Sequence, residues 1–285
     1  VSLMTDDPAQ QQPAPAKPPK AQIDLTVVQR LELSPSMVRI VASIGDPSSF
    51  RDIEPPEKYC KLVFFDPELG LGDHPDYWSL RETLPREHLP ATRHMTLRHV
   101  DLEAGQLWID VALHGDSGWA GPWAAGAQPG DTIVAVGPGG KWIPDPQASW
   151  SLMLGDEAAI PAVLANVEAM PEDARGEILL EVQDADHHLD IQVPSGWSLR
   201  WIHRAEAPAG FPALVEAART AQWPGTTDGI QVFAHGEREA MKALRPVLFE
   251  EHGLDRAQVS LSGYWARGRD EDAFQAEKKT PVGKV

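Results

Sequence analysis

An arginine and a threonine lie three residues apart in the segment RHMTLRHV, residues 93–100, which has the composition of a short β-strand. The guanidinium of Arg93 can form a forked, charge-assisted hydrogen bond with a phosphate or pyrophosphate group. The hydroxyl of Thr96 can donate or accept a hydrogen bond beside it. The pair therefore indicates a site for an anionic ligand, although a half-exposed strand without a ligand can carry the same residue types.

A strand-to-helix turn is predicted at residues 155–161, GDEAAIP. Gly155 permits close approach of a backbone or ligand, and Pro161 suits the first turn of a helix. Such turns at the carboxyl ends of parallel strands receive dinucleotide phosphates, although the pattern Gly-x-Gly-x-x-Gly is not present in this turn. Asp156 and Glu157 could instead cap the helix, so both interpretations stay open.

A glycine-rich segment at residues 113–126, LHGDSGWAGPWAAG, contains a second candidate ligand-binding turn. Residues 118–124 can expose backbone N–H groups at the start of a helix, which is a favourable place for a pyrophosphate. The alternative is a turn that serves only to place Trp119 and Trp123 in the core.

The charge balance restricts the partners of the chain. Its 285 residues include 25 Lys and Arg against 42 Asp and Glu, a formal net charge of -17. This balance leaves no broad basic surface for nucleic acid. An anionic ligand must therefore be held by a local cluster of cations, which makes individual cations in a cleft informative.

Thiol and metal chemistry receive little support. Cys60 is the only cysteine, which excludes an intrachain disulfide and an all-cysteine iron–sulfur or zinc site. Cys60 lies in an apolar strand, where a thiol is inert. The segment QDADHHLD, residues 183–190, is the best metal candidate by composition, but His187 and His188 lack a regular ligand spacing. A solvated turn is the more typical interpretation, and we predict no metal site.

Six β-rich segments fill the first half of the chain. Apolar residues alternate with polar ones, as Leu107, Ile109 and Val111 do, which is typical of antiparallel strands with one inward face. Six strands at this close spacing predict a small closed barrel. The segments are residues 23–31, 37–44, 59–65, 92–100, 107–114 and 131–137.

Strands alternate with helices after Pro144. This order predicts a parallel sheet covered by helices, and such sheets bind ligands at the carboxyl ends of their strands. The predicted strands are residues 151–157, 177–182, 199–204, 230–237 and 259–265. The predicted helices are residues 161–170, 211–221 and 238–253.

The elements predict four regions: a disordered lead-in at 1–21, a barrel domain at 22–146, an α/β domain at 147–268 and a charged, partly mobile tail at 269–285. The lead-in holds few large apolar side chains, so it cannot offset the entropy of ordering. No apolar run approaches the roughly 20 residues that span a membrane, and no signal-peptide pattern opens the sequence. We therefore expect a cytoplasmic protein.

The order of these motifs resembles that of siderophore-interacting proteins, the flavin-dependent ferric-siderophore reductases of the vibriobactin-utilisation type in the ferredoxin-reductase superfamily. The resemblance covers Ile23 to about Gly268. It implies an N-terminal six-stranded antiparallel FAD-binding β-barrel and a C-terminal parallel α/β domain of the type that binds nicotinamide nucleotides. The motifs are RHMT (93–96), LHGDSGWAGPWAAGAQPGD (113–131), GPGG (137–140), GDEAAIPA (155–162), IHR (202–204), AHGE (234–237) and GYWARG (263–268).

The resemblance also implies a set of site residues. Thr96 and Trp265 are expected to act at the redox-active edge of the flavin, and Lys61, Lys141 and Arg267 to bind the ferric substrate. Arg204 is a candidate for a ribose 2′-phosphate, although a salt-bridged arginine is an equal alternative. The residues expected to contact FAD or the nicotinamide donor are Arg93, His94, Met95, Thr96, His114, Gly118, Trp119, Ala120, Trp123, Gly155, Asp156, Glu157, Ala159, Pro161, Arg204, Gly236, Glu237, Tyr264 and Trp265.

Two positions depart from the family pattern. Met95 stands where the family usually has a tyrosine beside the flavin, so a thioether replaces a ring contact. Gly139 stands where relatives often have an arginine, and Lys141 is the substitute candidate for the third substrate-binding cation.

The implied function is a cytosolic ferric-siderophore reductase that uses FAD to pass electrons from NADPH or NADH to siderophore-bound Fe(III). The sequence leaves the donor open, and a ferredoxin is a further candidate. Two alternatives stay open: a ferric-siderophore binding or shuttling protein without turnover, and a ferredoxin-dependent flavin reductase. A monomer is expected by analogy with the family.

Overall fold

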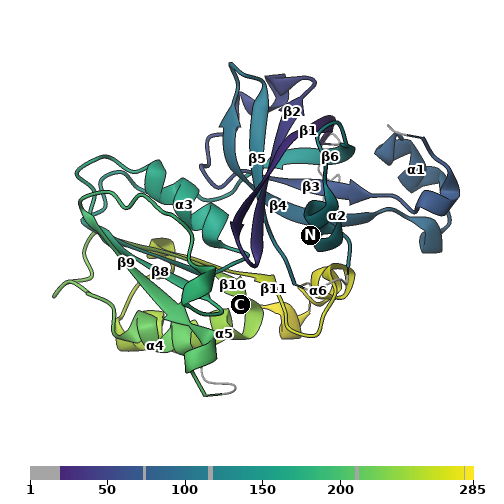
Figure 1. Ribbon diagram of the computed structural model, residues 1–285. Helices are drawn as coiled ribbons and strands as arrows, with labels where there is room; N and C mark the ends of the chain where they lie inside the picture. The colour runs from purple at the N-terminus through teal and green to yellow at the C-terminus, as the bar shows by residue number, and fades with distance from the viewer. Residues whose placement is uncertain (1–19, 73–74, 115–117, 209–211, 279) are drawn as a thin grey trace, which may run out of the picture.

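The structure is a computed structural model that describes residues 20–72, 75–114, 118–208, 212–278 and 280–285. Two bodies lie side by side in it: a β-barrel built by the first half of the chain and an open sheet with helices built by the second (Figure 1). The chain crosses from the barrel to the sheet between Gly139, the last residue of β6, and Trp150, the first residue of β7.

The barrel closes in the strand order β1-β2-β5-β4-β3-β6, which confirms the predicted six-stranded antiparallel barrel. Alternate side chains point inward, and those of Ile40, Leu62 and Leu107 are completely buried. Ala21, expected to belong to the lead-in, begins β1 and pairs with Gly137, because backbone pairing orders it without an apolar side chain. The strands are β1 (Ala21–Ser34), β2 (Met37–Ile44), β3 (Tyr59–Phe64), β4 (Ala91–Asp101), β5 (Gln106–Ala112) and β6 (Thr132–Gly139).

The sheet of the second half is parallel and has the strand order β11-β10-β7-β8-β9, which confirms the predicted α/β domain. Its central strands are continuous apolar runs because helices cover both of their faces. Leu152, Leu179 and Val232 are completely buried. The strands are β7 (Trp150–Asp156), β8 (Gly176–Val182), β9 (Trp197–His203), β10 (Ile230–Glu237) and β11 (Val259–Trp265).

One helix joins the sheet to the barrel. α3 (Ile160–Glu168) lies between them, whereas α4 (Ala213–Arg219) and α5 (Arg238–Pro246) cover the opposite face of the sheet (Figure 1). Met37 of the barrel belongs to the same buried apolar cluster as Ile160, so the two bodies share a core and hold a fixed relative position.

Two short helices do not belong to the predicted elements. α1 (Tyr77–Thr83) follows β3 and is capped by Asp76, whose carboxylate accepts from the Ser79 N–H at 2.7 Å. α6 (Glu271–Glu277) lies in the segment expected to be a charged, partly mobile tail. Phe274 of this helix is only 1% exposed, so this part of the expected tail is packed against the rest of the protein.

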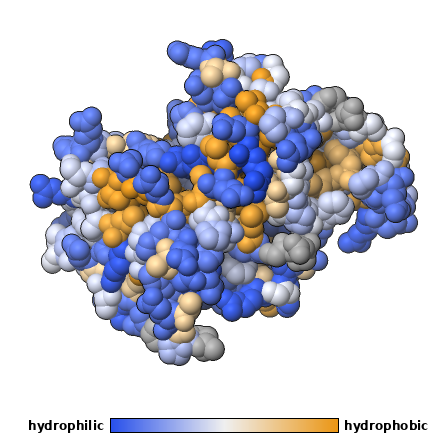
Figure 2. All heavy atoms as spheres, viewed as in Figure 1, coloured by the Kyte–Doolittle hydropathy of each residue, from blue (hydrophilic) through white to orange (hydrophobic). Residues whose placement is uncertain are grey.

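The face in Figure 2 shows hydrophobic residues in separate patches with hydrophilic residues between them. Across the described ranges, no helix is both long enough and apolar enough to cross a membrane.

Candidate functional site

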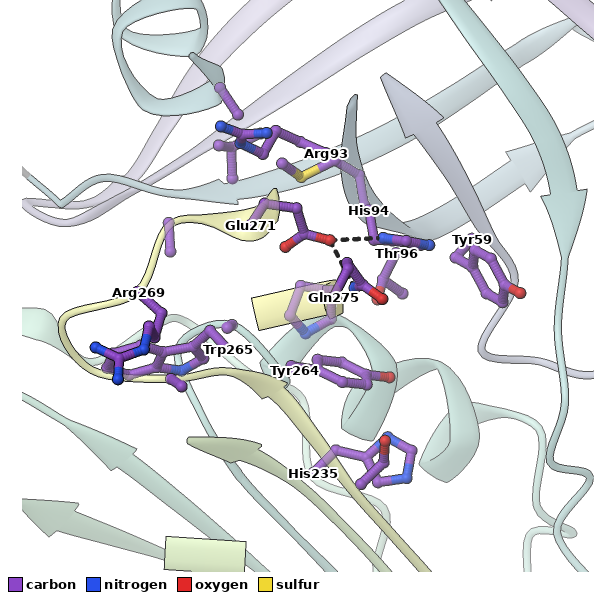
Figure 3. A pocket seen from close by; sticks show the side chains of 18 of the residues that line it. Tyr59, Arg93, His94, Thr96, His235, Tyr264, Trp265, Arg269, Glu271 and Gln275 are labelled. Atoms are coloured by element: carbon purple, nitrogen blue, oxygen red, sulfur yellow. Dashed lines mark hydrogen bonds and ion pairs between the residues drawn. The ribbon is translucent and has the colours of Figure 1, made fainter. Parts of the chain in front are cut away.

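A cavity of about 1150 Å³ lies between the barrel and the sheet. The barrel contributes β4, the end of β5 and the start of α2 (Ala120–Gly126), and the sheet contributes β11 along its length and His235 of β10. α6 closes a third side, and Figure 3 shows its residues between the two walls. The cavity therefore lies where the predicted ligand-binding segments of both halves meet.

The barrel wall contains the strand that carries the arginine and the threonine. Arg93 donates through Nη1 to the Thr92 carbonyl at 2.9 Å, and it has no carboxylate within 4.0 Å in the described part of the chain. Thr96 lines the cavity from this wall, and Tyr264, with its ring hydroxyl, lines it from the sheet. Burial raises the pKa of Tyr264, so this hydroxyl stays protonated.

The sheet wall presents aromatic side chains and a neutral histidine. Trp265 lies parallel to the His114 ring at a centroid distance of 6.1 Å, and Tyr264 meets the edge of His235 at 4.8 Å. His235 Nε2 is 3.0 Å from Ser260 Oγ, while its buried Nδ1 has no partner among the described residues. Burial lowers the pKa of His235 to about 3, so the ring is uncharged at neutral pH.

Asp156, the last residue of β7, hydrogen-bonds to residues at the ends of β10 and β11 behind this wall. Its Oδ2 accepts from the Glu237 N–H and from the Trp265 indole N–H, both at 2.8 Å, and its Oδ1 accepts from the Ala158 N–H at 3.1 Å. The carboxyl is fully buried, and this burial raises its pKa to about 7. Asp156 therefore fixes the orientation of the Trp265 indole and does not itself line the cavity.

The turn after β7 shows why a glycine stands at position 155. A Cβ there would lie 2.5 Å from the Ala159 Cβ and 2.7 Å from the His235 carbonyl oxygen. The glycine therefore allows the start of α3 to pack against β7 and β10. Ala158 and Pro161, on the same turn, line the cavity.

α6 spans the cavity from the sheet to the barrel. Glu271 Oε1 lies 2.9 Å from His94 Nδ1 and accepts from Gln275 at 2.8 Å (Figure 3). At the other end of the helix, Glu277 binds Arg238 and accepts from Arg269 at 2.6 Å. These contacts tie α6 to both halves of the protein.

The residues around the cavity fit the FAD that the resemblance implies. The cavity is larger than most ligand sites, which occupy about 300–1,000 Å³. Arg93 offers a guanidinium without a carboxylate partner in the described residues, which suits a pyrophosphate. Gly118 has φ 87°, and among the described residues no atom lies within 4 Å of a Cβ placed there, so its backbone is accessible to a ligand.

The cavity brings together about half of the predicted site residues. Asp156 and Trp123 are among those that lie outside it: Trp123 packs its ring edge against Phe64 at 6.2 Å. The predicted residues that line the cavity are Arg93, His94, Met95, Thr96, His114, Gly118, Trp119, Ala120, Lys141, Pro161, Tyr264 and Trp265. Those outside its lining are Lys61, Trp123, Gly155, Asp156, Glu157, Ala159, Arg204, Gly236, Glu237 and Arg267.

The predicted cations occupy different environments. Arg204 forms ion pairs with Glu157 at 2.6 Å and with Glu181 at 3.3 Å. These contacts agree with the interpretation of Arg204 as a salt-bridged arginine, the alternative to its binding a ribose 2′-phosphate. Lys61 lies beside His94 in the register of β3 and β4, and burial lowers the pKa of its ammonium. Arg267 is exposed and donates its backbone N–H to Glu237 at 3.1 Å.

Several lining residues are absent from the predicted set; they come from a connection, from strands β3, β5, β10 and β11, and from the segment expected to be a tail. Glu57 precedes β3 and accepts from the backbone N–H groups of Lys141 and Trp142, at 2.9 and 2.8 Å. A capping residue at 270 followed by a buried aromatic at 274 is the signal that could have predicted α6. The additional polar residues of the lining are Glu57, Tyr59, Asp110, His235, Ser260, Ser262, Arg269, Asp270, Glu271, Gln275 and Lys278.

The histidine-rich segment holds no metal cluster in the described residues, where no group of three or more His, Cys, Asp or Glu side chains is arranged for a metal ion. His187 Nδ1 contacts Asp184 at 2.6 Å, and His188 Nε2 contacts His203 Nε2 at 2.8 Å. His188 also stacks on Trp201 at 4.4 Å, so these rings form local polar and aromatic contacts.

Known proteins resemble the chain over nearly all of its described length. Residues 26–142 match the sequence family "siderophore-interacting FAD-binding domain". Residues 148–268 match the sequence family "siderophore-interacting protein". An uncharacterised protein of Mycobacterium tuberculosis is 42% identical over 266 residues, 89% of this chain and 93% of that protein. The ferric vibriobactin reductase of Vibrio cholerae is 35% identical over 257 residues, with the same two coverages.

A solved structure with the same arrangement comes from a siderophore utilization protein of T. fusca. It shares 32% sequence identity and a TM-score of 0.74, and the match covers 88% of this chain and 95% of that one. The similarity therefore extends over both the barrel and the sheet.

Proposed function

The chain belongs to the siderophore-interacting protein family and carries that family's FAD-binding domain, and from this premise we propose that it is an FAD-dependent ferric-siderophore reductase. One observation supports the proposal most directly. The cavity joins the Arg93-to-Thr96 strand of the barrel to the Tyr264–Trp265 end of the sheet, in a chain 35% identical to a ferric vibriobactin reductase.

The barrel residues would bind and orient the cofactor. Arg93 would pair with the pyrophosphate, and the open backbone at Gly118 would lie against it. Thr96, which lines the cavity, would hydrogen-bond at the edge of the ring. Bound FAD supplies the redox chemistry: it takes two electrons from a nicotinamide donor and passes them singly to iron.

The sheet residues would shape the opposite side of the site. The rings of Tyr264 and Trp265 line the cavity and would present aromatic surface to the bound cofactor. Asp156 keeps the indole of Trp265 in place through its hydrogen bond. NADPH or NADH would approach from the carboxyl ends of the strands, the usual ligand side of such a sheet.

The substrate would be an anionic, oxygen-rich ferric complex. Lys61 and Lys141 would attract it locally, because the net charge of -17 repels anions elsewhere on the protein. One electron per iron converts Fe(III) to Fe(II), which holds its oxygen donors less tightly and is released.

An anaerobic titration of the flavin-loaded protein with NADPH and then NADH tests this function. Bleaching of the flavin absorbance, followed by its return when a ferric siderophore is added and by capture of Fe(II) with a chelator, is the expected result. A protein that binds no flavin would refute the proposal. If the flavin stays oxidised with both nucleotides, the electron donor is not NADPH or NADH, and a ferredoxin becomes the leading candidate.

A further inference from the structure

The strand order of the parallel sheet indicates where a dinucleotide donor would cross it. In the order β11-β10-β7-β8-β9, the later strands β8 and β9 lie on one side of β7, and β10 and β11 lie on the other. The carboxyl ends of β7 and β10 therefore form the topological switch point, the usual ligand site of such a sheet. Pro161, after β7, and His235 of β10 line the cavity there. A donor whose nicotinamide enters the cavity would extend its adenosine half over β8 and β9.

Three charged side chains lie together at the carboxyl ends of β7, β8 and β9. Glu157 directly follows β7, Glu181 is the penultimate residue of β8, and Arg204 directly follows β9. Arg204 donates to Glu157 with both terminal nitrogens, Nη1 to Oε2 and Nη2 to Oε1, each at 2.6 Å. The same Nη1 also donates to Glu181 Oε1 at 3.3 Å. One guanidinium therefore serves two carboxylates.

The cluster is only partly open to solvent and has an excess of negative charge. The side chain of Glu157 is 6% exposed and that of Glu181 is 16% exposed, against 29% for Arg204. Among the described residues, neither carboxylate has a second Lys, Arg or His nitrogen within 4.0 Å. Burial raises the pKa of Glu181, and the charge of Arg204 opposes this rise. The guanidinium is thus fully engaged with acidic partners.

A ribose 2′-phosphate and a ribose 2′-hydroxyl make opposite demands on this cluster. To pair with a phosphate, Arg204 would have to release Glu157, and a carboxylate with 6% exposure would then lie unpaired, which is strongly unfavourable. The carboxylates would also repel the phosphate. A hydroxyl instead donates to a carboxylate that stays paired with Arg204.

The place of Glu181 in the sheet suits this second role. Glu181 lies near the end of the strand that follows the β7-to-α3 turn. In dinucleotide-binding sheets, an acidic residue roughly 20 residues after that turn binds the ribose 2′-hydroxyl of NAD.

We propose that Glu157, Arg204 and Glu181 make this chain selective for NADH over NADPH, with Glu181 accepting the ribose 2′-hydroxyl and Glu157 holding Arg204 away from a 2′-phosphate. This inference rests on the proposed function and names the electron donor of that reaction. Glu181 is on this view a specificity-determining residue, and Arg204 is the counter-ion that keeps both carboxylates in place.

The test measures nucleotide binding separately from turnover. NAD⁺ and NADP⁺, which differ only in the 2′-phosphate, are titrated into the flavin-loaded full chain by isothermal titration calorimetry. Glu181→Gln keeps the length of the side chain and removes one charge. Glu172→Gln removes the same charge at an exposed position before β8 and is the matched control. The rates of anaerobic flavin reduction by NADH and by NADPH give a second readout, and bound flavin is measured in each protein.

We expect the wild type to bind NAD⁺ at least roughly tenfold more tightly than NADP⁺ and to be reduced faster by NADH. Glu181→Gln should lower the Kd of NADP⁺ about tenfold and raise that of NAD⁺ about threefold, whereas Glu172→Gln should behave like the wild type. The wild-type comparison does not depend on the folding of any variant.

Three results would overturn the inference and leave the reductase proposal intact. The first is wild-type protein that binds NADP⁺ as tightly as NAD⁺ or more tightly. The second is a Glu181→Gln variant in which the ratio of the two Kd values is unchanged. The third is flavin-loaded protein that binds neither nucleotide. A chain that binds no flavin would overturn both proposals.

Discussion

Asp156 connects the stability of the protein to pH, and its replacement by asparagine tests the geometry behind the cavity wall. Three N–H groups converge on this fully buried carboxyl, from Ala158, Glu237 and Trp265. Burial outweighs those hydrogen bonds and raises the pKa from 3.8 to about 7. The folded protein therefore keeps a proton on Asp156 at pH values where the unfolded chain has lost it.

The sign and size of the effect follow from this difference in proton binding. The stability contribution is fully present below pH 3.8 and is lost as the pH rises through about 7. Between about pH 5 and about pH 8 the loss amounts to about 2.5 kcal/mol in the free energy of unfolding. Asparagine does not titrate, so Asp156→Asn should lack this part of the pH dependence. Near pH 5 the variant should be about 1 kcal/mol less stable, because its amide cannot accept from every N–H donor.

Urea unfolding of the wild type and of Asp156→Asn at about pH 5 and about pH 8 gives the change in the free energy of unfolding with pH for each protein. The difference between these two changes is the contribution of Asp156. Asp173→Asn, at an exposed position, is the matched control and should follow the wild type. Parallel pH dependences for the wild type and Asp156→Asn would refute the assignment of a raised pKa to this carboxyl.

Three further predictions concern packing, thiol reactivity and cofactor binding. Gly155→Ala should lower the free energy of unfolding by about 1–3 kcal/mol in urea titrations, because the new Cβ meets Ala159 and the His235 carbonyl. Burial raises the pKa of Cys60 to about 12, so a thiol reagent near pH 8 should label it only after unfolding; labelling of the native protein would contradict this. Arg93→Ala should raise the Kd of FAD about 10- to 100-fold in a fluorescence titration, whereas an unchanged Kd would remove Arg93 from the cofactor site.

The architecture could be predicted from the sequence because it depends on local periodicity. Apolar side chains alternate along the barrel strands, as at Leu107 and Ile109, and continuous apolar runs mark the parallel strands, as at Leu152. Strand-to-helix order then distinguishes a barrel from a helix-covered sheet. These signals lie within a few residues of one another, so they can be recognised without knowledge of tertiary contacts.

The segment expected to be a tail contains a helix that composition alone does not predict. Residues 269–285 are rich in charge, which is typical of mobile segments, yet α6 forms there. Its order depends on the burial of Phe274 and on ion pairs with Arg238, a residue 39 positions away in the sequence from Glu277. A charged segment is ordered when its partners are fixed elsewhere in the fold, and composition does not show those partners.

By itself the sequence determined the two-domain architecture, the family and the strand that carries Arg93 and Thr96. Only the tertiary structure showed that Asp156 holds Trp265, 109 residues away, and that Glu271 reaches His94, 177 residues away. Periodicity and motif order are properties of neighbouring residues, whereas a hydrogen bond or a shared cavity depends on which distant segments the folded backbone brings within a few ångströms. For the same reason, Lys278 was recognised as part of the cavity wall only once the end of the chain was placed beside β10 and β11.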